Sequence, residues 1–352
     1  MISRIALTNF RSYKDQAFDL DPNITVVVGP NATGKTNLLE SIFVLATTKS
    51  FRAKDQELIN HDAHYYRIVG KSDDSELALG FQVSHQGKEK RAQRDGAKQT
   101  LVQHIGHIQT VLFEPNDLQL ILGSPDRRRR YLDFILTQTQ PQYLSTMHRY
   151  RRVLQQRNSL LSDWQGQTQE LFAWNVKLTE LATDIDAARR DLIKHINGIA
   201  KDLYKDIAGA PEDLELTYIG SADPKDYASD FLASLERNIG RDVGAGFTTI
   251  GPHRDDFDIR FKRSDVTAVA SRGEMRTIVL VLKLSELKYV EQKTKRSPIL
   301  LLDDVFSELD DSRREYLIGT LNKYQTVITT TDGDVARRLG SSHVIETSGG
   351  SL

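Results

Sequence analysis

The 352-residue sequence contains no cysteine. Disulfide bonds, thiolate nucleophiles and cysteine-based zinc sites are therefore excluded. Its nine histidines show no metal-binding spacing, because no HExxH motif is present. The GxSxG motif of serine hydrolases is also missing, so covalent catalysis has no support in the sequence.

Long apolar runs are missing as well. No stretch approaches the roughly 18 consecutive apolar residues of a membrane-spanning helix, and the opening residues MISRIALTNF lack the apolar core of a signal peptide. Neither sign of charge dominates, since 47 basic side chains stand against 48 acidic ones. The simplest expectation is a cytosolic protein whose balanced net charge can still hide a local basic patch.

A phosphate-binding motif lies near the start of the chain. Residues 29–36 read GPNATGKT, which fits the P-loop pattern GxxxxGK[ST]. In a P-loop the backbone N–H groups cradle phosphates, the lysine reaches the outer phosphates and the threonine holds Mg²⁺. An apolar strand predicted over 24–28 and a helix predicted over 36–46 supply the flanking elements that the motif requires. The alternative is a glycine-rich helix cap.

A pair of carboxylates follows a second apolar strand, predicted over 299–302. We predict that Asp303 holds Mg²⁺, directly or through water, and that Asp304 polarises the attacking water. The alternative is an acidic pair that caps the strand end. Because the two motifs stand near opposite ends of the chain, a compact Ras-like GTPase is excluded. Their separation predicts a nucleotide-binding head whose halves flank an inserted domain.

The inserted part is predicted to be helical. Asp126 is placed to cap the first helix, and Pro141 is suited to begin the second. Apolar residues over 171–199 recur at alternating three- and four-residue steps, an a/d seam of about four heptads. We therefore predict an α-helical arm over 126–209.

The rest of the chain predicts an α/β head over 1–125 and 210–352, with a mixed and parallel sheet flanked by helices. A further helix is predicted over 280–289. The last ten residues are small and polar and are expected to fray. The other predicted strands cover 77–83, 110–113, 213–219, 255–262 and 327–330.

A second anion site is suggested ahead of the helix at 280–289. Ser271 and Gly273 at a helix N-terminus would bind an anion through backbone N–H groups and the helix dipole. Because the P-loop already binds one nucleotide, this site is interpreted as reaching the nucleotide of a partner subunit. An ordinary N-cap with Glu274 completing a capping box explains the residues equally well.

Basic residues cluster despite the neutral total. Eight arginines and one acidic residue, Asp133, occur over 127–157, and a second group covers 88–98. Such clusters favour a non-sequence-specific contact with DNA phosphates, although a solvated helix face is the better explanation for any single arginine. The motif GPHRDD at 251–256 places His253 either at a phosphate or partner contact or in a structural turn. The predicted DNA contacts are Arg127, Arg128, Arg129, Arg130, Arg149, Arg151 and Arg152.

Taken in order, these motifs resemble the RecF family of bacterial recombination mediators, which belongs to the ABC/SMC class of ATPases. The resemblance is nearly full length, and the ordered set is specific although single pieces such as FRSY are weak. Its pieces are LTNFRSY at 7–13, the P-loop with NLLE at 37–40, KSFR at 49–52, FEPND at 113–117, GSP at 123–125 with the arginines after it, GPHRDD, SRGE at 271–274 and 303–310.

The resemblance implies a role for each motif. The signature of ABC ATPases, which completes the site of the opposite subunit, would be Ser271, Arg272, Gly273 and Glu274. The D-loop at the dimer interface would be Ser307, Glu308, Leu309 and Asp310. Lys35 and Asp304 would be catalytic, and Thr36 and Asp303 would bind Mg²⁺. ATP would contact Gly29, Pro30, Asn31, Ala32, Thr33, Gly34, Lys35, Thr36, Asn37, Arg11 and Arg52.

Family members bind duplex DNA and its junctions with single strands, and act with RecR and RecO to load RecA at gaps. The resemblance therefore implies an ATP-dependent homodimeric DNA clamp for recombinational repair and replication restart, cytoplasmic and nucleoid-associated, with weak DNA-stimulated ATPase activity as a switch. The alternative is an ABC-type ATPase subunit of another DNA-processing or transport complex. The sequence departs from the family at Ala32, where glycine is usual, and at Glu274, where glutamine is common.

Overall fold

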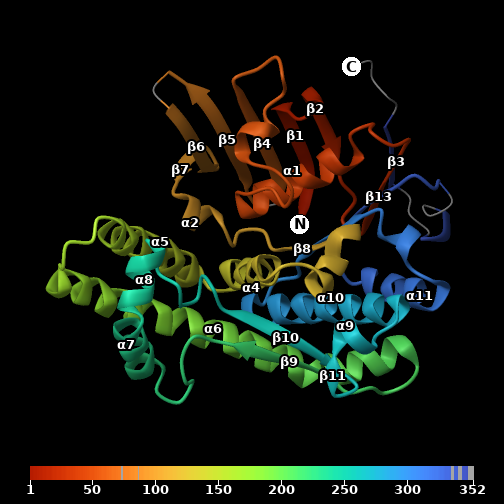
Figure 1. Cartoon of the computed structure of the whole chain (residues 1–352). Coiled ribbons are helices and arrows are strands. Elements are labelled where there is room, and N and C mark those ends of the chain that lie inside the picture. Colours follow the sequence, from red (N-terminus) through yellow and green to blue (C-terminus); the bar gives the residue numbers. More distant parts are fainter. Residues whose placement is uncertain (73, 86, 334–336, 340–342, 348–352) are drawn as a thin grey trace. The chain divides into compact units, whose positions relative to one another are not determined.

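The computed structural model describes residues 1–72, 74–85, 87–333, 337–339 and 343–347. The chain forms two compact units (Figure 1). Unit 1 combines Met1–Asp117 with Glu286–Leu352, and unit 2 is the continuous segment Leu118–Ser285. None of the helices in the described ranges combines the length and apolar content that a membrane crossing requires.

A five-stranded parallel sheet forms the core of unit 1, with strand order β14-β3-β13-β12-β8. Its inner strands are almost wholly buried and rich in aliphatic or β-branched residues, as expected of a parallel sheet covered on both faces. The predicted parallel strands are confirmed. The strands are β3 (Ile24–Val28), β8 (Thr110–Phe113), β12 (Ile299–Asp303), β13 (Thr326–Thr330) and β14 (His343–Glu346).

Strand β14 corrects the expectation that the last ten residues fray. His343–Glu346 pairs in parallel with β3, and Thr347 continues the pairing by donating its N–H to the carbonyl oxygen of Val28 at 2.8 Å. Backbone hydrogen bonding can therefore hold a segment whose side chains give little sequence signal. Residues 348–352 lie outside the described part of the chain.

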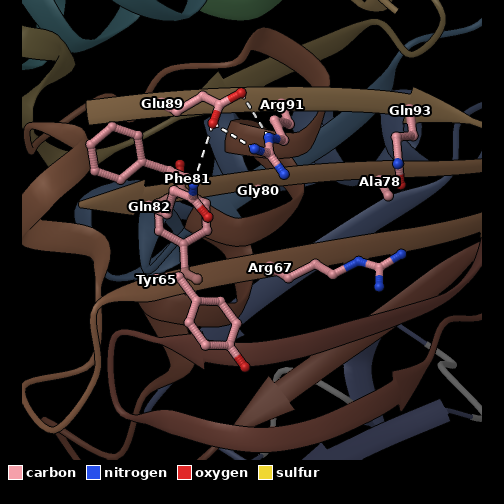
Figure 2. A pocket seen from close by; sticks show the side chains of 10 residues that line it. Tyr65, Arg67, Ala78, Gly80, Phe81, Gln82, Glu89, Arg91 and Gln93 are labelled. Carbon is pink, nitrogen blue, oxygen red and sulfur yellow. Dashed lines mark hydrogen bonds and ion pairs between the residues drawn. The ribbon is translucent and has the colours of Figure 1, made fainter. Parts of the chain in front are cut away.

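An antiparallel sheet of six strands, β2-β1-β4-β5-β6-β7, completes unit 1. Helix α1 (Lys35–Thr47) contacts strands of both sheets, which explains why eleven of its residues are buried. The outer face of the antiparallel sheet carries a hollow of about 210 Å³ in which Arg67 and Arg91 flank Gly80 (Figure 2). The strands are β1 (Ile2–Phe10), β2 (Tyr13–Asp19), β4 (Tyr65–Ser72), β5 (Glu76–Ser84), β6 (Gly87–Arg94) and β7 (Ala97–Gln99).

Shorter helices connect the strands of unit 1. They are η1 (Asp55–Leu58), α2 (Leu101–His104), η3 (Val305–Glu308) and α11 (Asp311–Leu321), whereas η2 (Pro115–Leu118) lies at the boundary with unit 2. Helix α10 (Arg272–Thr294) begins in unit 2 and ends in unit 1. It starts earlier than the predicted 280–289, so the SRGE motif lies at the first turn of the helix.

Unit 2 is built around the long helix α6 (Thr168–Ala208). The predicted seam is confirmed, since Leu171, Leu178, Ile185 and Leu192 recur at seven-residue steps and are fully buried. The other elements are α3 (Gln119–Leu122), α4 (Pro125–Thr139), α5 (Pro141–Ser162), α7 (Tyr227–Arg237), α8 (Ile239–Ala245), α9 (Val266–Val269), β9 (Leu214–Ile219), β10 (Asp256–Phe261) and β11 (Ser264–Asp265).

Two details of unit 2 differ from the sequence predictions. Ser124 occupies the N-cap of α4 and Pro125 is its first residue, so Asp126 lies in the first turn instead of capping the helix. The compact units also divide the chain differently from the predicted head and arm, because 210–285 packs with the arm. Strand β9 contacts α6, and Asn197 exchanges two hydrogen bonds with the backbone of Leu216, both 2.8 Å long.

Candidate functional site: a P-loop with paired carboxylates

The P-loop joins β3 to α1, as predicted. Gly34 has φ of 99°, and a Cβ atom there would come within 2.9 Å of the Tyr13 hydroxyl oxygen, so the position requires glycine. That hydroxyl donates to the carbonyl oxygen of Gly34 at 3.0 Å. Ala32 also has a left-handed φ, 65°, which is unfavourable for a residue with a side chain. Alanine at this position therefore leaves strain in the loop.

Lys35 folds back over its own loop. Its Nζ donates to the carbonyl oxygens of Gly29 and Pro30 at 2.8 and 2.7 Å. Burial lowers the pKa of Lys35, while the negative charges of Asp304 and Asp303 act in the opposite direction. The ammonium group is thus held among the P-loop carbonyls and near both carboxylates, where an outer phosphate would be neutralised.

Thr36 and Asp303 are joined across the site. The Thr36 hydroxyl donates to Oδ1 of Asp303 at 2.8 Å, and the Thr329 hydroxyl donates to the same oxygen at 2.6 Å. No residue that the structure describes donates to the other oxygen, Oδ2. A hydroxyl that donates to a carboxylate keeps its lone pairs available, and Mg²⁺ prefers oxygen ligands of this kind. The donor set therefore fits the predicted metal role of Thr36 and Asp303.

Asp304 adopts an unusual backbone conformation at the end of β12. Its φ and ψ are 51° and 30°, a left-handed geometry that aspartate tolerates better than most residues. Burial and the charge of Asp303 raise the pKa of Asp304, and Lys35 partly offsets this rise. A cavity of about 130 Å³, lined also by Ser307 and Thr331, lies beside it. This volume holds several water molecules, so the position suits the predicted orientation of an attacking water.

Arg11 and Arg52 are brought together by a side chain that the site prediction did not include. Glu40 on α1 is fully buried and accepts hydrogen bonds of 2.9 to 3.0 Å from both guanidinium groups, and one of 2.5 Å from the Ser50 hydroxyl. Burial would raise the pKa of Glu40, but these hydrogen bonds lower it below its ordinary value. The sequence signal was a single acidic residue within the largely apolar stretch 38–46.

The D-loop residues adjoin the carboxylates. The Ser307 hydroxyl donates to the carbonyl oxygen of Asp304 at 2.7 Å, and Leu309 is buried. Asp310 caps α11 by accepting from the N–H of Arg313 at 3.0 Å. The segment is thus fixed to the same strand end as Asp304, within unit 1.

The SRGE motif lies in unit 2 and forms a capping box at the start of α10. The N–H of Ser271 donates to Oε2 of Glu274 at 2.8 Å, and the N–H of Glu274 donates to the Ser271 hydroxyl at 3.3 Å. Hydrogen bonds from Lys262 and from the Ser271 N–H lower the pKa of Glu274 to about 2. The geometry matches the capping alternative, and a trans-acting role for the same residues stays a prediction.

The predicted DNA-binding arginines fall into two groups. Arg128 donates twice to the Asp256 carboxylate, at 2.7 and 2.6 Å, and Arg129 donates to the carbonyl oxygen of Asp255 at 2.9 Å. These two hold the GPHRDD segment and are poorly placed for DNA. Arg130 pairs with Asp126 on its own helix. The arginines that are exposed and have no side-chain partner in the described part of the chain are Arg127, Arg149, Arg151 and Arg152.

Two further predicted contacts are structural. His253 is mostly buried, its Nδ1 paired with the Tyr150 hydroxyl at 2.7 Å and its Nε2 with the carbonyl oxygen of Thr248 at 3.1 Å, so it belongs to a structural turn. In the second basic group, Lys90 is nearly buried and pairs with Asp55. That group is therefore weaker as a DNA site than its sequence suggests.

The comparisons with known proteins agree with these features. The model of the RecF/RecN/SMC N-terminal domain matches residues 1–345. The DNA replication and repair protein RecF of Bacillus cytotoxicus is 38% identical over 349 residues, covering 95% of this chain and 92% of the relative. Its counterpart in Bacillus thuringiensis is 37% identical over 351 residues, with the same coverage.

Solved structures give the same result. The recombination mediator protein RecF–ATP of the RecFOR pathway is 32% identical, with a TM-score of 0.87, covering 95% of this chain and 92% of that one. An Smc head bound to the C-winged helix domain of ScpA shares the fold alone, at 17% identity and a TM-score of 0.52, covering 94% and 90%. The predicted α/β class with an ABC-type head is confirmed. The chain belongs to the RecF family of DNA replication and repair proteins.

Proposed function

We propose that the protein is an ATP-gated DNA clamp that acts in recombinational repair and replication restart. The proposal rests chiefly on the P-loop site, where Lys35, Thr36, Asp303 and Asp304 converge in unit 1. Family membership and the solved RecF–ATP structure support it, since that relative was seen with ATP. On this basis residues 29–37 bind the phosphates of ATP.

The two carboxylates and Lys35 would then have different roles in ATP hydrolysis. Mg²⁺, held by Thr36 and Asp303, would neutralise phosphate charge during phosphoryl transfer. Lys35 exchanges its P-loop carbonyl partners for phosphate oxygens. Asp304, whose raised pKa makes it a better proton acceptor, orients water in the adjoining cavity. We propose slow hydrolysis, because slow turnover suits a switch more than a metabolic enzyme.

A second copy of the chain would complete each site. The SRGE motif of one copy would approach the nucleotide of the other, and the D-loop, fixed to Asp304 through Ser307, would lie at the interface. ATP would then favour the closed dimer by the difference between its affinities for the closed and open states. Dimerisation would therefore depend on nucleotide.

DNA would contact the exposed arginines of α4 and α5. Arg149, Arg151 and Arg152 lie within four residues of one another, which suits contacts with duplex phosphates. We further propose that the clamp prefers single-strand/duplex junctions, acts with RecR and RecO to load RecA, and works on the cytoplasmic nucleoid.

Binding to a labelled gapped duplex, with no nucleotide, ATP or ADP, tests the proposal when light scattering follows the oligomeric state. ATP should give dimers and tight, salt-sensitive binding. Lys35→Ala should abolish ATP binding and dimerisation together, whereas Asp304→Asn should keep dimers and slow release. If DNA binding does not depend on nucleotide and the protein stays monomeric, the clamp proposal is wrong.

The arginines are tested in the same assay. Replacing Arg149, Arg151 and Arg152 by alanine should weaken DNA binding and reduce its salt dependence without changing ATP-dependent dimerisation. The matched control removes three exposed lysines, Lys54, Lys205 and Lys225, and should leave binding nearly unchanged. Equal effects of the two triple variants would show that only net charge matters.

A further inference from the structure

A threonine on β13 contacts both acidic residues of the site. Thr329 is 1% exposed, and its hydroxyl donates to Oδ1 of Asp303 at 2.6 Å. The oxygen of the Thr329 hydroxyl in turn accepts a hydrogen bond from the N–H of Asp304 at 3.1 Å. A hydroxyl has one proton to donate and lone pairs to accept. The carbonyl oxygen of Leu302 lies 3.4 Å from the same hydroxyl, but the shorter contact with the charged Oδ1 takes the proton.

The backbone of Thr329 adds a third connection. Asp303 and Thr329 are register partners in the parallel pair β12–β13, and the carbonyl oxygen of Thr329 also accepts from the N–H of Asp304 at 3.1 Å. That N–H is thus shared between two oxygens of one residue. Left-handed backbone in a non-glycine residue persists only where its surroundings hold it, and these bonds hold Asp304.

The other buried threonines of β13 do not reach the carboxylates. The hydroxyl of Thr326 donates to the carbonyl oxygen of Tyr324 at 3.1 Å, and that of Thr330 accepts from the N–H of Asp332 at 3.0 Å. A buried parallel strand normally carries valine or isoleucine, which cost no desolvation of a hydroxyl. Thr329 therefore makes specific side-chain hydrogen bonds that valine, of the same shape, would remove, while its backbone hydrogen bond to Asp304 would remain.

We propose that Thr329 is a positioning residue that orients Asp303 toward the metal and fixes the backbone that presents Asp304 to water. The inference rests on the proposed nucleotide site. Because Thr36 and Thr329 both donate to Oδ1, they set the carboxylate plane and direct Oδ2 away from them. Thr36 has the additional task of binding the metal, so Thr329 is the donor dedicated to orientation.

Thr329→Val, with Thr329→Ser as the rescue and Thr326→Val as the matched control, tests the assignment. In Thr329→Val the Mg²⁺-dependent gain in affinity for a fluorescent ATP analogue should fall about tenfold, the loss expected for one hydrogen bond to a charged group. Affinity without Mg²⁺ should stay unchanged, because Lys35 and the loop are intact. The turnover number should fall with the Mg²⁺ response, and serine should restore both.

Hydrogen exchange of a peptide covering 300–306 gives a readout that needs no turnover. Without nucleotide, Thr329→Val should exchange the Asp304 amide faster, while Thr326→Val should not. Wild-type Mg²⁺ response and wild-type exchange in Thr329→Val would overturn the inference, as would failure of serine to rescue. If the wild-type protein binds no nucleotide, the proposed function fails, and the exchange result alone still decides whether Thr329 holds Asp304.

Discussion

Glu40→Gln should destabilise unit 1 by about 3 kcal/mol, because the carboxylate is the shared acceptor of a buried cluster. It accepts two hydrogen bonds from Arg11 and one from Arg52, and Ser50 donates a fourth. Glutamine keeps one acceptor oxygen, which holds two of the four, and turns an N–H₂ group toward the remaining donors. Two charge-assisted hydrogen bonds are lost, each worth about 1.5 kcal/mol.

The value of about 1.5 kcal/mol is the low end of the usual range for a hydrogen bond to a charged group. It applies here because water can hydrate the arginines once the bonds are lost. Their side chains are 22% and 38% exposed, so neither becomes a fully buried unpaired charge. Both tryptophans, Trp164 and Trp174, lie in unit 2, and tryptophan fluorescence therefore does not report on the cluster. Hydrogen exchange of peptides from α1 during urea titration is the suitable assay.

The control is Glu76→Gln, an exposed carboxylate of unit 1 whose replacement should change the free energy of unfolding by less than about 0.5 kcal/mol. Unchanged protection of α1 in Glu40→Gln would refute the reasoning. It would show that the arginines find equivalent partners or that the cluster contributes little.

Two further predictions concern backbone strain and pH. Ala32→Gly should raise the free energy of unfolding by roughly 0.5–1 kcal/mol, because the left-handed φ of 65° suits glycine; an unchanged or lower urea midpoint would contradict this. Burial lowers the pKa of His253 from 6.5 to about 4, so the folded state favours the neutral ring, and the resulting stability is present above pH 6.5 and lost as pH falls toward 4. The stability difference between wild type and His253→Gln should therefore shrink over that range, and a constant difference would show that the ring does not titrate as inferred.

Local motifs predicted the P-loop and its carboxylates, because the loop, the strand before it and the helix after it are continuous in sequence. The strands β12 and β13 were also predictable, since the first is a short apolar run and the second consists of β-branched residues. In contrast, β1 and β6 mix polar and apolar residues, and β6 carries only one buried residue, so their patterns gave no strand prediction.

Partners distant in sequence account for most of what the sequence could not show. Arg128 and Asp256 pair across 128 positions, and Thr36 and Asp303 across 267. The P-loop pattern anticipated the second pair. Nothing in an arginine run distinguishes a residue that holds a neighbouring segment from one that faces solvent. Ser124 illustrates the same limit at short range, because either it or Asp126 could cap α4.

The strand order β14-β3-β13-β12-β8 has a consequence for biosynthesis. Unit 2 is one continuous segment, whereas the parallel sheet needs β3 and β8 from early in the chain and β12, β13 and β14 from its last part. During translation, at about 5–20 residues per second, unit 2 can fold while β3 and β8 still lack their partners. The P-loop therefore becomes competent last, after residues 299–346 have emerged from the ribosome. A nascent or prematurely terminated chain would therefore expose the arginine-bearing helices before the nucleotide site has formed.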